Sequence, residues 1–478
     1  YEDLPIETIL EKVKSIVAKC NKNSPFEKEF NQFEKKNLEK FGPQGKVPPF
    51  KSKEFQEVLE PIFEPSKYDN EMALSQYFKY AKPFCEWLFG KRLQTKRRKS
   101  IESVIDDMSD RDTLSSNSGY PRFRRRSVVK DEEIQDALTG KAFEYPAILL
   151  GRHYHGKLRP VWMYPMSMNL LEYQFSQVIQ DSLRNSPNPQ VRAHLSPWEG
   201  YEDVKRTLTS YWHGQTIVGG DTTKMDAHMR RAQNRLCYEL VKGLFQKHEW
   251  DDLYKVIMRV NDIPILVGPN DMIQGYHGLA SGSGWTQLLE TLLVLFIAWL
   301  HKIKHSMGIG DDFTFLANIT AEQLVKWLAE FGLPANALKQ TVSKLVLDFL
   351  QRCNAQGFFS REDPNVLGAY YSIIRMANSD FLPEKFHNPK QWNSDMFCVR
   401  HYMITENGVD DPGWEEYVLW TAKGQKDLIN FAKKSASELN RIQEEARLIP
   451  GLNPSYNQEK RLKPLSEFAS IKLVRDSL

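Results

Sequence analysis

The sequence predicts an α/β protein of the α+β kind, in which helices surround an antiparallel sheet, and three stretches carry that prediction. Residues 216–220 (Thr-Ile-Val-Gly-Gly) form a short apolar run typical of a buried strand. Residues 307–313 (Met-Gly-Ile-Gly-Asp-Asp-Phe) set a glycine and two acids between apolar flanks, which favours a tight hairpin. Residues 285–302 form a long apolar stretch between them, which predicts a buried helix.

The first part of the chain is expected to be mainly helical. Apolar residues spaced three to four apart predict a helix over residues 6–16, and a second helix is expected over 71–88. Between them, residues 41–65 hold five prolines and are predicted to be extended. Residues 145–150 and 157–164 alternate apolar and polar side chains, so we predict two strands there.

Helices and short strands are expected to alternate in the rest of the chain. The apolar spacing predicts helices over residues 168–183, 321–330 and 336–350. A short strand pair is expected within residues 366–374. The composition changes near residue 380, where we expect a separate C-terminal lobe to begin.

The length and charge of the chain limit the number of domains and the kinds of partner that we expect. At 478 residues the chain is long enough for several domains or one multi-lobed body. The net charge is only +3, but residues 91–130 hold twelve Lys and Arg against five Asp and Glu. Such clustering is expected where a protein contacts a polyanion, although a solvated basic segment explains it equally well.

Cysteine usage and hydropathy exclude several classes of protein. The five cysteines are dispersed and form no Cys-x-x-Cys pair, which argues against a structural zinc site and fits a reducing compartment. The longest apolar run, residues 291–300, is too short to cross a bilayer, and no signal peptide is visible. The sequence begins with Tyr rather than Met, which leaves room for an omitted N-terminal segment.

The acidic pair Asp311-Asp312 is the first candidate site. Adjacent carboxylates repel each other, so a fold retains them mainly where a cation neutralises them, although an ordinary solvated turn is the alternative. Asp221 follows the predicted strand 216–220, and Asp226 comes five positions later. If the two strands are neighbours, Asp221 meets Asp311, and three carboxylates can hold two divalent ions. A helix N-cap is the alternative interpretation of the Asp221 segment.

Two further stretches fit a phosphorylated ligand. Residues 278–286 are rich in glycine and serine and open the apolar helix, which favours a ligand-contacting loop over a linker. The strand over 157–164 places Lys157 and Arg159 on one face, where two cations suit a triphosphate. An exposed edge strand protected by charges is the alternative for that strand.

The order and spacing of these motifs resemble those of viral RNA-dependent RNA polymerases. The series is a basic strand, Asp-x4-Asp, Ser-Gly-x3-Thr before a helix, and then Gly-Asp-Asp, over residues 115–375. Two segments are most similar in sequence to polymerases of picobirnaviruses, and then to those of partitiviruses. They are residues 281–287 (Ser-Gly-Ser-Gly-Trp-Thr-Gln) and residues 157–162 (Lys-Leu-Arg-Pro-Val-Trp).

The resemblance implies a right hand of fingers, palm and thumb, closed by N-terminal contacts between fingers and thumb. Residues 1–90 would form a helical region that bridges fingers and thumb. The fingers would take residues 91–215, and the palm residues 216–375, with an insertion of the fingers near 240–275. The thumb, or C-terminal lobe, would take residues 376–478.

The resemblance also implies roles for individual residues. Asp221 and Asp311 would bind two Mg²⁺ (or Mn²⁺) ions with Asp312 as a looser third ligand, and Asp226 would recognise the ribose 2′-hydroxyl. The nucleotide and template side would be lined by Ser281, Gly282 and Thr286, and the triphosphate would be held by Arg152, Lys157 and Arg159. The template would enter at Ser118, Gly119, Tyr120 and Pro121, and the primer strand would be supported by a hairpin with Gly368 and Tyr370.

The sequence departs from the family pattern at two places. Many relatives have an asparagine four residues after the threonine that matches Thr286, and this chain has Glu290 there. A glutamate beside Asp226 must be protonated, paired elsewhere or turned away. Many relatives also use a lysine to protonate pyrophosphate, and here Lys339 and Lys344 are candidates.

We therefore expect an RNA-directed RNA polymerase that replicates and transcribes a double-stranded RNA genome. Its partners would be an RNA template, the nascent strand, NTPs and a capsid protein, with no membrane, inside the virion or the host cytoplasm. Two alternatives remain open. The chain could be an RNA-binding virion component with an inactive palm, or a reverse transcriptase.

Overall fold

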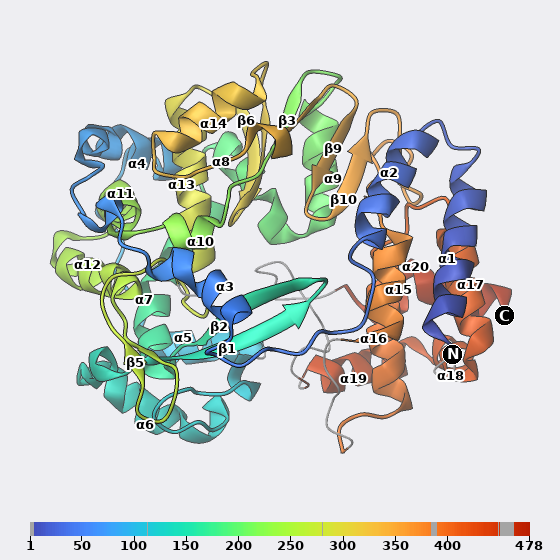
Figure 1. Ribbon diagram of the computed structural model, residues 1–478, viewed down its shortest axis with the longest axis horizontal. Coiled ribbons are helices and arrows are strands. Elements are labelled where there is room, and N and C mark those ends of the chain that lie inside the picture. The colour runs from blue at the N-terminus through green and yellow to red at the C-terminus, as the bar shows by residue number, and fades with distance from the viewer. Residues whose placement is uncertain (1–3, 112, 280, 384–389, 448, 450–462) are drawn as a thin grey trace.

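The computed structural model describes residues 4–111, 113–279, 281–383, 390–447, 449 and 463–478. Helices and antiparallel sheets alternate along the chain, as the sequence predicts (Figure 1). Most of the buried apolar side chains form one large core, and the C-terminal helices enclose a second core together with α1.

The N-terminal region lies against both sides of the molecule. Helices α1 (Ile6–Asn21) and α2 (Glu27–Leu38) pack on α15 (Ile373–Phe381). The following segment crosses to the other side of the ribbon, where α3 (Lys53–Phe63) packs on β2 (Lys157–Met163) and on the short α10 (Met225–His228) (Figure 1). The predicted helix over 71–88 is instead a 3₁₀ turn followed by α4 (Ala81–Phe89).

The next part of the chain combines helices with a mixed sheet. The strands run in the order β2-β1-β4-β5, and a tight turn joins β1 to β2. Both predicted strands are therefore confirmed. The elements are α5 (Ile101–Asp110), α6 (Arg126–Leu138), β1 (Ala147–Tyr154), β2 (Lys157–Met163), α7 (Met166–Arg184), α8 (Pro189–His194), α9 (Tyr201–Tyr211), α11 (Arg231–Val241), α12 (Trp250–Met258), β4 (Ile265–Leu266) and β5 (Met272–Ile273).

An antiparallel sheet in the order β6-β7-β3-β8 forms the centre of the molecule. Its strands are β3 (Ile217–Gly220), β6 (His305–Ile309), β7 (Asp312–Leu316) and β8 (Thr341–Ser343), flanked in sequence by α13 (Thr286–Leu300) and α14 (Ala321–Ala329). Val218 and Phe313 belong to the large core with α13, while Ile217 and Met307 pack in a small core under α9. Both faces of the sheet are therefore buried, which explains the nearly continuous apolar run in β3.

The predicted helix over residues 336–350 is wrong. That segment forms β8 and β9 (Val346–Phe349), and β9 pairs with β10 (Arg352–Ala355), which pairs with β11 (Tyr370–Tyr371). The apolar spacing fits a helix, but Thr341, Val342 and Val346 are β-branched, and β8 completes the edge of the central sheet beside β3. Tertiary pairing therefore overrides the local pattern.

The C-terminal lobe consists of helices α16 (Ser394–Glu406), α17 (Trp414–Gly424), α18 (Lys426–Ala432), α19 (Ala436–Arg447) and α20 (Ala469–Ser477). Asn378 of α15 joins this side of the molecule to two distant segments. Its Oδ1 accepts a hydrogen bond from the Gly42 N–H (2.8 Å), and its Nδ2 donates to the Tyr154 hydroxyl at the tip of β1 (3.2 Å). A single buried amide thus ties the N-terminal segment and the β1–β2 hairpin to α15.

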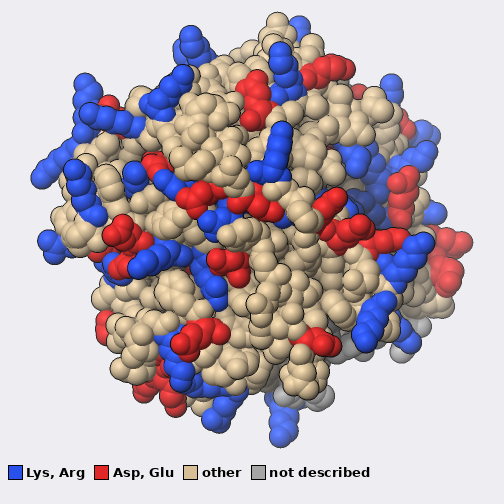
Figure 2. All heavy atoms as spheres, turned by 60° about the vertical axis from the view of Figure 1, so that its left-hand side comes forward, with Lys and Arg blue, Asp and Glu red and all other residues tan. Residues whose placement is uncertain are grey.

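The basic run over residues 91–130 is partly neutralised by acids. Arg98 pairs with Glu249 and Asp252, and Lys99 pairs with Asp181. Arg111 and Arg122 also lie in ion pairs. Figure 2 shows Lys and Arg side chains intermingled with Asp and Glu over one face of the molecule. The local excess of positive charge is therefore smaller in the fold than in the sequence. Among the described helices, none is long and apolar enough to span a membrane.

Candidate functional site

Asp221 and Asp311 lie at the same end of the central sheet. Asp221 directly follows β3, whose last residue, Gly220, is opposite Phe313 of β7. Ile309 pairs with Asp312, so Gly310 and Asp311 form a two-residue turn between β6 and β7, and the predicted hairpin is confirmed. Gly310 has φ +59°, which glycine adopts without strain, and its N–H donates to Thr291 Oγ1 of α13 (2.9 Å).

The two acids of the hairpin differ in environment. Partial desolvation by the surrounding protein and repulsion from Asp226 and Asp221 raise the pKa of Asp311. Burial and repulsion from Asp311 raise the pKa of Asp312 to about 7. Asp312 Oδ2 accepts a hydrogen bond from the Leu350 N–H (3.2 Å), while the Asp311 side chain is exposed at the turn. Asp311 is therefore available to a ligand, and Asp312 is partly engaged by the neighbouring segment.

These carboxylates fit a divalent cation that a substrate helps to bind. Their mutual repulsion raises the pKa of Asp311, and a cation would relieve that cost. Within the described residues, no three His, Cys, Asp or Glu side chains lie close enough to hold a metal by themselves. Mg²⁺ at phosphoryl-transfer sites is commonly held by one or two carboxylates plus substrate phosphates and water. Asp221 and Asp311 are the residues that could contribute carboxylates to a site of that kind.

The backbone of Asp221 is held by a residue that the sequence did not single out. Gln340 Oε1 accepts from the Asp221 N–H (2.9 Å), and Gln340 Nε2 donates to the Asp221 carbonyl oxygen (2.6 Å). The same Nε2 donates to the carbonyl of Asn336 (3.1 Å). The Gln340 amide thus bonds both backbone groups of Asp221, as a neighbouring strand would, just beyond the end of β3. No pattern in the sequence marks this glutamine.

The register of β8 separates the two candidate lysines. Thr341 is opposite Gly219, next to Asp221, and Ser343 is opposite Ile217 at the far end of β3. Lys339 precedes Gln340 and lies at the Asp221 end of the sheet, whereas Lys344 follows Ser343 at the other end. Lys339 is therefore the better placed candidate for donating a proton to pyrophosphate.

Glu290 lies buried beside Asp226. Burial raises the pKa of Glu290 well above its usual range, and the charge of Asp226, a hydrogen bond with it and the charge of Asp311 raise it further. The raised pKa favours the protonated form of Glu290, in which its carboxyl group can donate a hydrogen bond to Asp226. Of the three outcomes that the sequence left open for this pair, protonation is the one that the structure favours. A neutral glutamic acid can supply the donor that an asparagine supplies in many relatives.

The glycine-rich loop is attached to Asp226 at one end and to β2 at the other. The Leu279 N–H donates to the Asp226 carbonyl (2.8 Å), and the Trp162 N–H donates to Ser281 Oγ (3.2 Å). A Cβ on Gly282 would lie 2.1 Å from the Trp162 carbonyl oxygen, so only glycine fits there. Thr286 is the first residue of α13. The structure thus brings Ser281, Gly282 and Asp226 together around one loop.

The predicted triphosphate-binding cations lie on the β1–β2 hairpin. Arg152 and Arg159 are directly opposite each other, an arrangement that is unfavourable without an anion between them. The positive charge of Arg159 partly offsets the rise in the pKa of Asp311, so Arg159 lies close enough to interact with the acidic turn. Burial and repulsion from Lys157 and other cations lower the pKa of Lys40. The basic strand and the acidic pair therefore face one another.

The segment predicted to admit the template is tightly folded. Ser118 is fully buried, and its carbonyl oxygen accepts from the Met166 N–H (2.9 Å). Gly119 has φ +69°, and a Cβ there would lie 2.8 Å from the Tyr164 carbonyl oxygen. Tyr120 is half-buried and Pro121 is exposed. Ser118 and Gly119 thus shape the turn, and Tyr120 and Pro121 are the residues a strand could touch.

Tyr370, which the resemblance places in the hairpin that supports the primer strand, lies in the protein interior. Its side chain is fully buried, its hydroxyl donates to Glu34 Oε1 (2.7 Å), and Asn21 Nδ2 donates to that hydroxyl (3.0 Å). The tyrosine therefore anchors the N-terminal helices rather than facing a ligand. Gly368 is packed against Phe359, whose carbonyl oxygen would be 2.8 Å from an added Cβ. Any support of a primer by this hairpin must come from other atoms.

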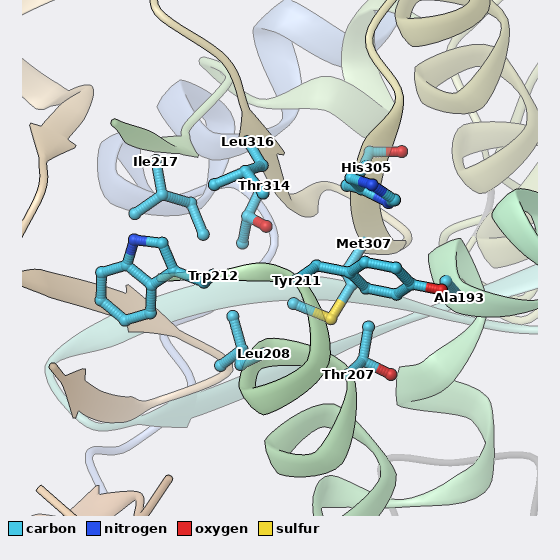
Figure 3. A pocket seen from close by; sticks show the side chains of 11 residues that line it. Ala193, Thr207, Leu208, Tyr211, Trp212, Ile217, His305, Met307, Thr314 and Leu316 are labelled. Carbon is cyan, nitrogen blue, oxygen red and sulfur yellow. The ribbon is translucent and has the colours of Figure 1, made fainter. Parts of the chain in front are cut away.

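A small cavity lies at the opposite end of the sheet (Figure 3). Trp212, Ile217, His305 and Leu316 are among its lining residues. His305 and Ile217 both pair with Leu316, four residues along β7 from Asp312. The cavity therefore belongs to the packing of α9 on the sheet and is separate from the carboxylate site.

The known proteins that match this chain in sequence and in structure include polymerases of picobirnaviruses. No protein-family model matches the chain. A potential RNA-dependent RNA polymerase of human picobirnavirus (strain Human/Thailand/Hy005102/-) is 26% identical over 378 residues, which cover 72% of this chain and 68% of that protein. Two crystal structures of the RNA-dependent RNA polymerase of a human picobirnavirus, one of them an insertion-loop deletion mutant, superpose with TM-scores of 0.80 at 21% and 22% identity.

The superpositions cover the whole of this chain and 92% of each solved chain. The fold is therefore that of a viral RNA-dependent RNA polymerase, with its antiparallel sheets and surrounding helices. The resemblance to picobirnavirus polymerases, which rests on sequence motifs, is confirmed by both kinds of comparison.

Proposed function

We propose that this chain, a relative of the picobirnavirus RNA-dependent RNA polymerases, is an RNA-directed RNA polymerase that uses two divalent metal ions. One observation carries the proposal. The acidic turn at Asp311, the strand end at Asp221 and the cationic β1–β2 hairpin face one another, as nucleotidyl transfer requires.

The reaction joins a 3′-hydroxyl oxygen to the α-phosphorus of an NTP and releases pyrophosphate. Asp221 and Asp311 would hold the two ions, which lower the pKa of the attacking hydroxyl and neutralise charge when bound. Lys157 and Arg159 orient the triphosphate by their charge. Lys339 can supply the proton that pyrophosphate takes up as it leaves.

The sugar of the nucleotide is recognised at Asp226. A carboxylate accepts a hydrogen bond from a ribose 2′-hydroxyl, and a deoxyribose offers none. Glu290 in its protonated form donates to Asp226 and keeps that carboxylate oriented. The protein thus selects ribonucleotides through a pair of acids that share one proton.

The biological setting forms part of the same proposal. The proteins that match are picobirnavirus polymerases. We extend the proposal to replication and transcription of a double-stranded RNA genome, to a capsid protein as partner, and to a location in the virion interior and the host cytoplasm.

A templated extension assay tests the function. The protein is incubated with Mg²⁺ and defined single- or double-stranded RNA, with and without a primer, and each NTP is supplied alone. We expect incorporation only of the NTP that is complementary to the template. Incorporation of any NTP regardless of template, or of dNTPs in preference to NTPs, would contradict the proposal. The second outcome would favour a reverse transcriptase, and no turnover would favour an inactive RNA-binding component.

A further inference from the structure

Two loops that the resemblance to viral polymerases places along the template pack on the same strand end. We call residues 116–126 the entrance loop and residues 281–285 the glycine loop. Gly119 of the entrance loop packs against the Tyr164 carbonyl oxygen. Gly282 of the glycine loop packs against the Trp162 carbonyl oxygen and the Tyr164 Cβ. The end of β2 is therefore held between the two loops.

Asn169 of α7 connects the two loops through its side chain. Its Oδ1 accepts from Arg126 Nη2 of the entrance loop (3.1 Å). Its Nδ2 donates to the Gly282 carbonyl oxygen of the glycine loop (3.2 Å) and to Glu172 Oε1 (2.9 Å). Asn169 is fully buried, so water does not compete for these bonds.

Glu172, one turn further along α7, completes the connection. Its Oε1 accepts from the Gly284 N–H (2.9 Å), and its Oε2 accepts from the Ser283 hydroxyl. Ser283 Oγ in turn accepts from the Trp285 N–H (3.1 Å), where α13 begins. The Glu172 side chain is fully buried, and it accepts hydrogen bonds from α7 and the glycine loop. The carboxylate thus holds Ser283 and Gly284 directly, and Trp285 through the Ser283 hydroxyl.

We propose that Asn169 and Glu172 form a buried polar link that couples the entrance loop to the glycine loop, so that both loops bind single-stranded template RNA as one unit. This inference rests on the proposed polymerase function for the identity of the ligand. Asn169 and Glu172 are positioning residues, because they act on RNA through Arg126 and the glycine loop.

The coupling follows from where the bonds lie. Arg126 is also bonded within the entrance loop, since its N–H donates to the Ser116 carbonyl (2.9 Å) and its Nε donates to the Asn117 carbonyl (3.3 Å). A movement of the entrance loop therefore pulls on Asn169 Oδ1, and the opposite end of the same amide holds Gly282. A rigid amide that is bonded at both ends transmits a displacement between the loops.

A double-mutant cycle on RNA affinity tests the coupling. A short fluorescein-labelled single-stranded RNA is titrated with the full chain, and its anisotropy is measured at fixed salt without NTPs. Arg126→Gln removes the bond to Asn169 from the entrance loop. Asn169→Asp keeps an acceptor for Arg126 but loses both donors on the glycine-loop side. Arg125→Gln is the matched control, since Arg125 is an exposed arginine of the same loop.

We expect Arg126→Gln and Asn169→Asp each to weaken RNA binding about fivefold and the double variant to weaken it by about the same factor. The effects of Arg125→Gln and Asn169→Asp should instead multiply. If Asn169→Asp fails to fold, Ser283→Ala removes the hydroxyl that Glu172 binds and replaces it in the cycle.

Multiplying effects of Arg126→Gln and Asn169→Asp would overturn the coupling, as would unchanged affinity in folded variants or absence of RNA binding by the unaltered protein. Failure of the proposed function is seen separately. It would show as absent templated extension by the unaltered protein, whatever the outcome of the binding cycle.

Discussion

At the scale of single residues, the site depends on how closely acids are placed to one another. Partial desolvation and the charges of Asp226 and Asp221 raise the pKa of Asp311, and burial and the charge of Asp226 raise the pKa of Glu290. Strand and turn patterns predict Asp221 and Asp311, and the role of Asp226 is what the family resemblance implies. The state of Glu290 depends on its burial, which a sequence does not display.

Glu290 is expected to support Asp226 by donating a hydrogen bond from its protonated carboxyl group. Glu290→Gln keeps a donor for Asp226, so discrimination between CTP and dCTP should be retained. Glu290→Leu removes the donor and leaves the Asp226 carboxylate unsupported, so discrimination should fall by about tenfold. The ratio of kcat/KM for the two nucleotides measures the effect. Equal discrimination by the Gln and Leu variants would contradict a hydrogen-bonding role.

Gln340 is expected to position Asp221. Gln340→Ala removes both hydrogen bonds to the Asp221 backbone, and kcat should fall by about tenfold while KM for RNA is unchanged, because misplacement by a fraction of an ångström slows transfer. Gln323→Ala, at an exposed position of α14, is the control and should leave kcat unchanged. If single-nucleotide kinetics give the same kcat for both variants, the positioning role fails.

At the scale of elements, local patterns predict most strands and helices that reach the site. The strand before Asp221, the Asp311 hairpin and the helix after the glycine loop each carry their own turn or apolar signal. The segment over 336–350 could not be predicted, because its pairing with β3 joins residues more than one hundred positions apart. Gln340 was missed for the same reason.

The close pairing of β3 and β7 predicts a strict requirement for glycine. A Cβ on Gly220 would lie 2.1 Å from the Phe313 ring, which is fully buried and has no room to move. Gly220→Ala should lower the free energy of unfolding by about 1–3 kcal/mol. Gly424→Ala in α17 should be neutral or stabilising, because an added Cβ would have no neighbouring atom within 4 Å outside its own stretch of helix. Urea denaturation measures both, and equal stability of the two variants would contradict the packing.

At the scale of the whole molecule, the N-terminal region holds the two sides together. Glu34 of α2 accepts from the Tyr370 and Ser372 hydroxyls and from the Ile373 N–H at the start of α15 (2.6–2.7 Å). Asn378, one turn later, binds Gly42 and Tyr154. The resemblance implies a hand closed by N-terminal contacts, and in that arrangement these hydrogen bonds would contribute to the closure.

Loss of the Asn378 amide is expected to loosen that closure. Asn378→Leu leaves the Gly42 N–H and the Tyr154 hydroxyl without their partner, so amide hydrogens in residues 41–46 and 153–157 should exchange about tenfold faster. Asn365→Ala, at an exposed loop position, should leave those rates unchanged. Unchanged exchange in Asn378→Leu, measured by mass spectrometry, would show that other contacts hold the segments together.

The most direct test of the account compares templated nucleotide incorporation by the unaltered protein and by Asp311→Asn at the same Mg²⁺ concentration. The substitution keeps the size of the side chain and removes its charge, so it should abolish incorporation while the thermal unfolding midpoint is unchanged or rises. Asp348→Asn, which alters a carboxylate of β9 that pairs with Lys36, is the control and should retain incorporation. Templated incorporation by folded Asp311→Asn at the rate of the unaltered protein would contradict the assignment of the site.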